Sequence, residues 1–124
     1  MPSELPIVFF EITEYMVAFR QFEVRQFNGV EARIRGLIRC TGHSTTGENY
    51  RLDVYFLASD SAFPLPVLDL PNKNGAIFLP ISDMTTIIDV LRYEKPIYGH
   101  LRGDKPEWTG ITTGQEPVGE GLES

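Results

Sequence analysis

The sequence is poor in the residues that stabilise small scaffolds or hold metals. It contains one cysteine, Cys40, and two histidines, His43 and His100, among 124 residues. A single thiol excludes an intrachain disulfide, and these three residues lack the paired spacing of zinc sites. We therefore expect no metal and no other cofactor, and we expect the protein to reside in a reducing compartment, the cytoplasm.

Long hydrophobic runs are also missing. The longest stretches of consecutive apolar residues hold four or five residues, as at 7–10 and 54–58, whereas roughly 20 are needed to span a bilayer. No lysine or arginine precedes Arg20, so the N-terminal stretch lacks the basic start of a secretory signal. These absences argue against a transmembrane segment and against a signal peptide.

Positive charge is scarce outside one segment. Between positions 20 and 51 there are six arginines and three glutamates, a net charge of +3. The whole chain carries −6, so the rest of the chain carries −9. A nucleic-acid footprint normally makes a domain basic overall, so the sequence argues against a nucleic-acid partner. The arginines are typical of the solvated face of a sheet, with a binding face as the alternative.

What the chain does contain is alternation of apolar and polar residues, which is typical of strands with one solvated face. This pattern predicts strands at 22–27, 30–40 and 50–58, and shorter strands at 76–81, 97–102 and 108–113. In the alternation at 30–40, the even-numbered residues would all face the core, Cys40 included. The first sixteen residues permit a strand or a short helix, and we favour a strand.

The dipeptide Asn28-Gly29 predicts a tight hairpin between the first two of these strands. A two-residue loop would place the apolar Val24 opposite the charged Arg33. A three-residue loop places Val24 opposite Ala32 and also pairs opposite charges on the outer face. On these grounds we predict the three-residue loop.

One helix is predicted at about 83–94, where apolar residues recur at helical spacing. They lie at i, i+3, i+4 and i+7, and are Met84, Ile87, Ile88 and Leu91. Pro96 bounds the helix at its far end. The three prolines between 63 and 71 exclude a helix or a central strand there and indicate an extended crossover.

These elements predict an α+β fold in which β-structure dominates. We expect a mostly antiparallel sheet of five to seven strands, either curved or closed into a partly open barrel, with one helix against it. Residues 1–113 would form a single globular domain. Residues 114–124 have no basic residue and three glutamates, and we expect a disordered acidic tail.

Candidate ligand-binding residues lie in the predicted strand at 97–102. Tyr98, His100 and Arg102 alternate with apolar or small residues, so they share one face and can together bind an anion or a small ligand. His43 is a further candidate. An exposed sheet face contains the same residue types, and no nucleophile and base stand at a recognisable spacing. We therefore assign no catalytic residue and no enzyme class.

Aromatic residues point to an interaction surface. They make up 11% of the chain and crowd its N-terminal part, which predicts more apolar surface than one small core covers. As interface candidates we name Phe9, Phe10 and Trp108, although the ring of Trp108 is also suited to closing one end of the core. The function that the sequence favours is a small non-enzymatic binding or assembly module, acting as a homo-oligomer or as a subunit of a complex. The alternative is a small-ligand-binding protein, with catalysis left open, whose site holds Tyr98, His100 and Arg102.

Overall fold

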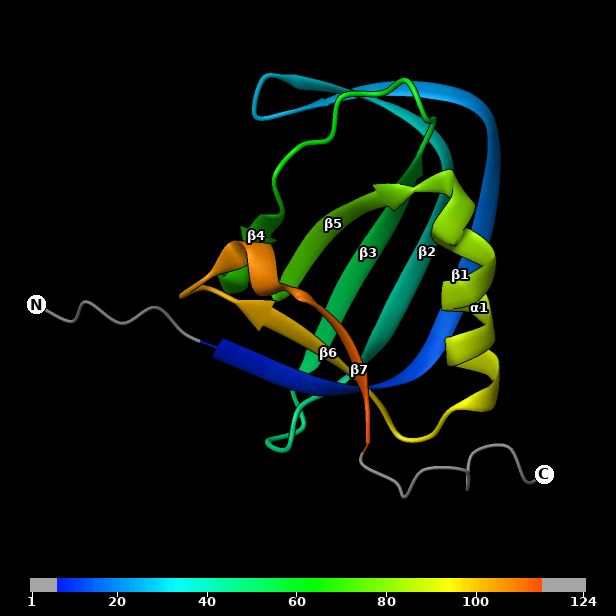
Figure 1. The fold of residues 1–124 in the computed structure, drawn as a ribbon. Helices are drawn as coiled ribbons and strands as arrows, with labels where there is room; N and C mark the ends of the chain where they lie inside the picture. Colours follow the sequence, from blue (N-terminus) through cyan, green and yellow to red (C-terminus); the bar gives the residue numbers. More distant parts are fainter. Residues whose placement is uncertain (1–6, 115–124) are drawn as a thin grey trace, which may run out of the picture.

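A sheet of seven strands and one α-helix make up the computed structural model, which describes residues 7–114 (Figure 1). The strands are β1 (Ile7–Phe27), β2 (Val30–His43), β3 (Asn49–Leu57), β4 (Val67–Asp69), β5 (Asn74–Pro80), β6 (Ile97–Arg102) and β7 (Gly110–Thr113). The helix is α1 (Met84–Tyr93), and short 3₁₀ turns lie at η1 (Leu70–Asn72), η2 (Ile81–Asp83) and η3 (Pro106–Trp108). Apart from Gly114, the predicted acidic tail at 114–124 lies outside the described residues.

The strands are ordered β4-β5-β3-β2-β1-β6-β7, and the sheet curls without closing (Figure 1). Every neighbouring pair is antiparallel except β3 and β5, which run parallel. Two parallel neighbouring strands begin at the same end of the sheet, so a long connection must bring the chain back to that end. The proline-rich segment at 63–71 belongs to that connection. The prediction of a mostly antiparallel, curved sheet with one helix is confirmed, with the single parallel pair as an addition.

Helix α1 packs on one face of the sheet and matches the helix predicted at about 83–94. Its buried residues are Met84 and Leu91, both from the apolar stripe. Gly36 of β2 allows this close packing, because a Cβ atom there would lie 2.6 Å from Met84 Sδ. Among the described residues, no helix is both long and apolar enough to cross a membrane.

The hairpin between β1 and β2 differs from the prediction. Phe27 pairs with Val30, so the loop has two residues and not three. Asn28 and Gly29 both have positive φ, 51° and 82°, as a type I′ turn requires, and this turn matches the twist of the strands it joins. Cross-strand pairs alone favour the three-residue loop, but the backbone preference of Asn-Gly for a two-residue type I′ turn outweighs them.

Side-chain packing gives the second reason for this register. The ring of Phe27 lies 5.3 Å from the ring of Tyr55 and 4.7 Å from that of Phe78. Phe22 and Val24, which the predicted register placed inside, are 51% and 48% exposed. This register therefore packs the partly buried ring of Phe27 against two other aromatic rings and leaves Phe22 and Val24 about half exposed.

Irregularities in pairing also divide the long alternation predicted for 30–40. Between β2 and β3 the register shifts between Ile34 and Gly36, where β2 has one extra residue. Such a bulge reverses which side chains face which side of the sheet. Ile34 consequently lies on one face and Ile38 on the other, and the prediction that all even-numbered residues share a face is wrong.

The bulge explains why the molecule has two clusters of buried residues, one on each face. The main core lies on the face covered by α1 and includes Phe10, Ile38, Cys40, Leu52, Val54, Phe56, Met84, Leu91, Ile97 and Leu101. The second core lies on the opposite face and consists of Ala32, Ile34, Leu37, Tyr55, Leu57 and Phe78. The thiol of Cys40 is buried as predicted, and burial raises its pKa to about 12, with the charge of Asp53 acting in the same direction. It is thus an inert core residue.

Candidate functional site

The three candidates on β6 lie on one face of the strand, as predicted, but each has different neighbours. The Nε2 atom of His100 lies 2.7 Å from the Thr112 hydroxyl of β7. Burial lowers the pKa of His100, and the charge of Arg102 lowers it further. Arg102 itself donates hydrogen bonds of 2.9 and 2.8 Å to Asp104. Its charge is therefore already matched within the chain.

Tyr98 is instead brought close to the fourth candidate, His43. Both residues line a surface hollow of about 380 Å³. Phe9 lines the same hollow and also packs against His100, with ring centres 5.0 Å apart. The structure thus brings Tyr98 and His43 to one hollow, while His100 contacts Phe9 and Thr112, and Arg102 pairs with Asp104.

The predicted interface residues also separate. Trp108 is 56% exposed and lies between two cations, 5.1 Å from the Arg102 guanidinium and 4.3 Å from the Lys105 ammonium, so it does not close the core. Phe9 is 55% exposed. Phe10 is 1% exposed and packs in the main core, because side chains on a strand alternate between its two faces. It is therefore not available as an interface residue.

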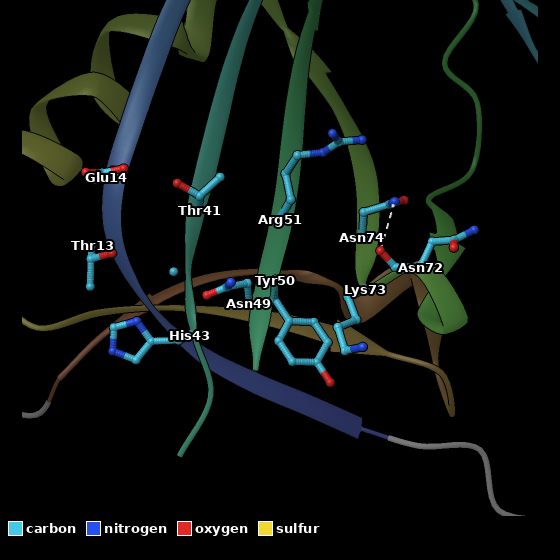
Figure 2. Close-up of a pocket in the computed structure, with 11 residues that line it drawn as sticks. Thr13, Glu14, Thr41, His43, Asn49, Tyr50, Arg51, Asn72, Lys73 and Asn74 are labelled. Atoms are coloured by element: carbon cyan, nitrogen blue, oxygen red, sulfur yellow. Dashed lines mark hydrogen bonds between the residues drawn. The ribbon is translucent and has the colours of Figure 1, made fainter. Parts of the chain in front are cut away.

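A second region, which we call the polar cleft, lies on the face opposite α1 and has a volume of about 400 Å³ (Figure 2). Part of its lining is one row across four neighbouring strands, because Glu14 pairs with Thr41, Thr41 with Arg51, and Arg51 with Asn74. The cleft is completed by Thr13, Gly42, His43, Asn49, Tyr50, Asn72 and Lys73. Of these residues, His43 was predicted to bind a ligand, and Arg51 belongs to the six arginines at 20–51 for which a binding face was the alternative.

Charges of both signs lie next to the polar cleft: Glu14 lines it, and Glu48 and Asp69 accept hydrogen bonds from Tyr50 and Asn72 of its lining. The carboxylate of Asp53 is buried, and it accepts hydrogen bonds of 2.9 and 3.4 Å from Arg39. The Nε atom of Arg51 lies 3.4 Å from the same carboxylate. One buried negative charge is thus shared by two guanidinium groups, and the group of three carries a net charge of +1.

The turn between η1 and β5 supplies the third cation of this region. Lys73 adopts the left-handed conformation with φ 61°, and its carbonyl accepts a hydrogen bond of 3.0 Å from the backbone N–H of Arg51. Asn72 and Asn74 flank it, and the Asn74 amide donates to the carbonyl of Asn72 (Figure 2). This backbone contact fixes Lys73 beside Arg51 at the border of the cleft.

The third region is the outer edge of β1. On the side away from β2, β1 pairs with β6 only through residues 7–11. Residues 12–27 have no strand partner on that side within the described chain. Large apolar side chains of this stretch are nevertheless exposed: Tyr15 (37%), Met16 (45%), Phe19 (72%), Phe22 (51%) and Val24 (48%).

Residues 7–114 contain no group of three or more histidine, cysteine, aspartate or glutamate residues arranged to hold a metal ion. No protein-family model, curated protein or solved structure matched this chain.

Proposed function

We propose that this protein is a non-enzymatic assembly module that acts in the cytoplasm as a homodimer, joined through the outer edge of β1. The observation that carries this proposal is the open edge at residues 12–27, bordered by exposed aromatic and aliphatic side chains. An unpaired strand edge presents backbone N–H and C=O groups that a further strand can satisfy. Exposed apolar side chains beside it add the burial that makes such pairing stable.

The far half of this edge, residues 19–27, offers the best access. In Figure 1 the blue β1 continues past the start of α1 and runs with β2 over the top of the molecule. We call residues 19–27 of β1 the arm, and its last residue, Phe27, packs against the second core. Phe19, Phe22 and Val24 are exposed on this arm. The guanidinium carbon of Arg33 lies 5.0 Å from the centre of the Phe22 ring and covers part of that ring. The remaining exposed surface of Phe19, Phe22 and Val24 is open to a partner.

Charge complementarity indicates a second copy of the same chain as the partner. Arg20 and Glu23 form an exposed ion pair within the arm. When two arms lie antiparallel, with the two-fold axis between residues 21 and 22, Arg20 of each chain stands opposite Glu23 of the other. The same register places Phe19 opposite Val24. A two-fold interface of this kind is self-complementary, as homodimers require.

Sedimentation velocity over a wide range of protein concentration tests the proposal. The wild type is expected to dimerise, and Arg20→Glu to raise the dimer Kd at least about tenfold, because glutamates then oppose each other. The double variant R20E/E23R restores opposite charges and should restore dimerisation. Glu23 also pairs with Arg25 of the same chain, so thermal unfolding of each variant is measured alongside to show that the fold is intact.

A matched pair of apolar substitutions separates this interface from general stickiness. Phe19→Ser removes a 72% exposed side chain from the arm, and Leu65→Ser removes a 78% exposed side chain from the crossover. Only Phe19→Ser should weaken the dimer. Charges and bulges can instead protect a strand edge from pairing. In that case the wild type would stay monomeric at the highest concentration, which would overturn the proposal. Equal effects of Phe19→Ser and Leu65→Ser on the dimer Kd would overturn it as well.

A further inference from the structure

The surface hollow of about 380 Å³ beside β6 is lined from three strands, and we call it the aromatic hollow. Phe9 and Glu11 of β1, His43 of β2 and Tyr98 of β6 belong to its lining. Phe10 lies in the main core, on the face that α1 covers, so the neighbouring side chains of Phe9 and Glu11 point to the other face of the sheet. These two side chains therefore project outward, where a ligand can reach them.

Glu11 occupies the middle of a row across these three strands. It pairs directly with Tyr98 on one side and with His43 on the other. Directly paired side chains share a face of the sheet, and their Cβ atoms lie about 5 Å apart. In Figure 2 the His43 ring points away from Arg51 and Lys73. The carboxylate of Glu11 is thus flanked by a phenol ring and an imidazole ring.

The Glu11 carboxylate has no cation beside it in the hollow. Among residues 7–114, no hydrogen bond or ion pair involves the Glu11 side chain, and no lysine or arginine belongs to the lining. Arg102, further along β6, already pairs with Asp104. With histidine counted as neutral, the lining of the aromatic hollow carries one negative charge.

The charges on the α1 side of Glu11 do not reverse this sign. A second hollow, between β1 and the end of α1, also has Glu11 in its lining. Its other charged residues are Glu14 and Glu94 on one hand and Arg92 and Lys95 on the other, two of each sign. The charge of Glu11 therefore remains as the excess. The whole chain carries −6, and negative charge in a concave region of an acidic protein attracts cations to it.

The aromatic rings indicate which class of cation fits. Phe9 is 55% exposed, and together with Tyr98 it places two rings around the carboxylate. Aromatic rings attract organic cations through their faces, and quaternary ammonium groups are recognised by such rings. A metal ion requires several ligating side chains, and the described residues contain no group of three that could supply them. One carboxylate among rings thus matches an organic cation.

From this arrangement we infer that the aromatic hollow binds a small alkylammonium compound. The charged nitrogen lies against the Glu11 carboxylate, and its alkyl groups lie against the rings of Phe9 and Tyr98. The volume of the hollow falls within the range of small-ligand sites. This inference keeps Tyr98 and His43 from the small-ligand site that the sequence offered as the alternative function. It does not depend on the proposed dimer, because the arm shares no residue with the hollow.

Titrations followed by ¹H–¹⁵N NMR test the inference, with choline and butylammonium as probes. Each probe has a neutral reference of similar shape, which is dimethylbutanol for choline and butanol for butylammonium. At least one probe should shift the amide signals of Phe9, Glu11, His43 and Tyr98 in a saturable way. It should bind at least about fivefold more tightly than its neutral reference, because only the cation interacts with the carboxylate and the rings. No saturable shift with either probe, or equal affinity for the neutral reference, would overturn the inference.

Two substitutions assign the binding to these side chains. Glu11→Gln removes the charge with little change of shape and should weaken the bound probe at least about fivefold. Phe9→Leu keeps an apolar side chain but removes the ring, and should weaken it about two- to fivefold. Because the Phe9 side chain is 55% exposed, Phe9→Leu keeps the test valid if Glu11→Gln is unstable.

The control for these substitutions is Glu31→Gln. It removes the same charge from an exposed glutamate of β2, which pairs with Gln26 at the hairpin end of the strand. Its affinity for the probe should equal that of the wild type. An equal loss in Glu31→Gln, or unchanged affinity in Glu11→Gln or Phe9→Leu, would overturn the inference.

Discussion

At the scale of single residues, the ion pair of Arg102 and Asp104 carries the clearest electrostatic signature. The hydrogen bonds that Arg102 donates hold the pKa of Asp104 at about 2, below its ordinary value of 3.8. The same guanidinium lies over the Trp108 ring, so the pair also positions the η3 turn. Arg102 thus stabilises the connection from β6 to β7 through contacts inside the chain.

We expect this ion pair to contribute to the loss of stability in acid. Because the pKa is lowered in the folded state, the stabilisation is complete above the unfolded-state value of 3.8 and is lost as the pH falls through about 2. Urea unfolding of the wild type and of Asp104→Asn should therefore show a gap in midpoint at neutral pH. The gap should close between pH 3.8 and pH 2. A gap that stays constant over this interval would contradict the assignment.

The polar cleft illustrates which single residues the sequence could not identify. His43 stands out because histidine is rare in this chain, whereas Arg51 and Lys73 have the appearance of ordinary surface residues. They become neighbours because β3 and β5 run parallel, which follows a long crossover and leaves no local signal. The same holds for Glu14, whose place opposite Thr41 depends on a register shift after Ile12.

At the scale of elements, features with a local cause were predicted well. The helix follows from the spacing of four apolar residues and from Pro96, which are both visible in a short window of sequence. The strands follow from alternation in the same way. Strand register was harder, because the bulge in β2 and the aromatic contacts of Phe27 depend on residues distant in the chain.

The hairpin register makes a prediction for two phenylalanines of β1. Phe27→Ala should destabilise the fold by about 2 kcal/mol, because its ring contacts Tyr55 and Phe78 of the second core. Phe22→Ala should cost about 0.5 kcal/mol or less, since the ring is 51% exposed. Urea unfolding measures both values. The reverse order would favour the three-residue loop and contradict the two-residue turn.

At the scale of the whole molecule, the proposed dimer interface and the polar cleft use different parts of β1. The interface involves residues 19–27 of the arm, and the cleft involves Thr13 and Glu14, which lie earlier in β1 (Figures 1 and 2). Sites without shared residues normally behave additively. Substitutions in the arm should therefore leave the polar cleft unchanged.

The shared strand β1 has a consequence for how the molecule opens locally. Its first residues pair with β6 and its later residues with β2, and register shifts at Ile12/Glu14 and Phe19/Glu23 interrupt the ladder. Amide protons at such interruptions exchange with solvent faster than those of continuous pairing, because fewer bonds must break. Hydrogen exchange should therefore divide this one strand into separately protected segments. The arm beyond Phe19 would then open without disturbing the main core, as an independent unit within a continuous strand.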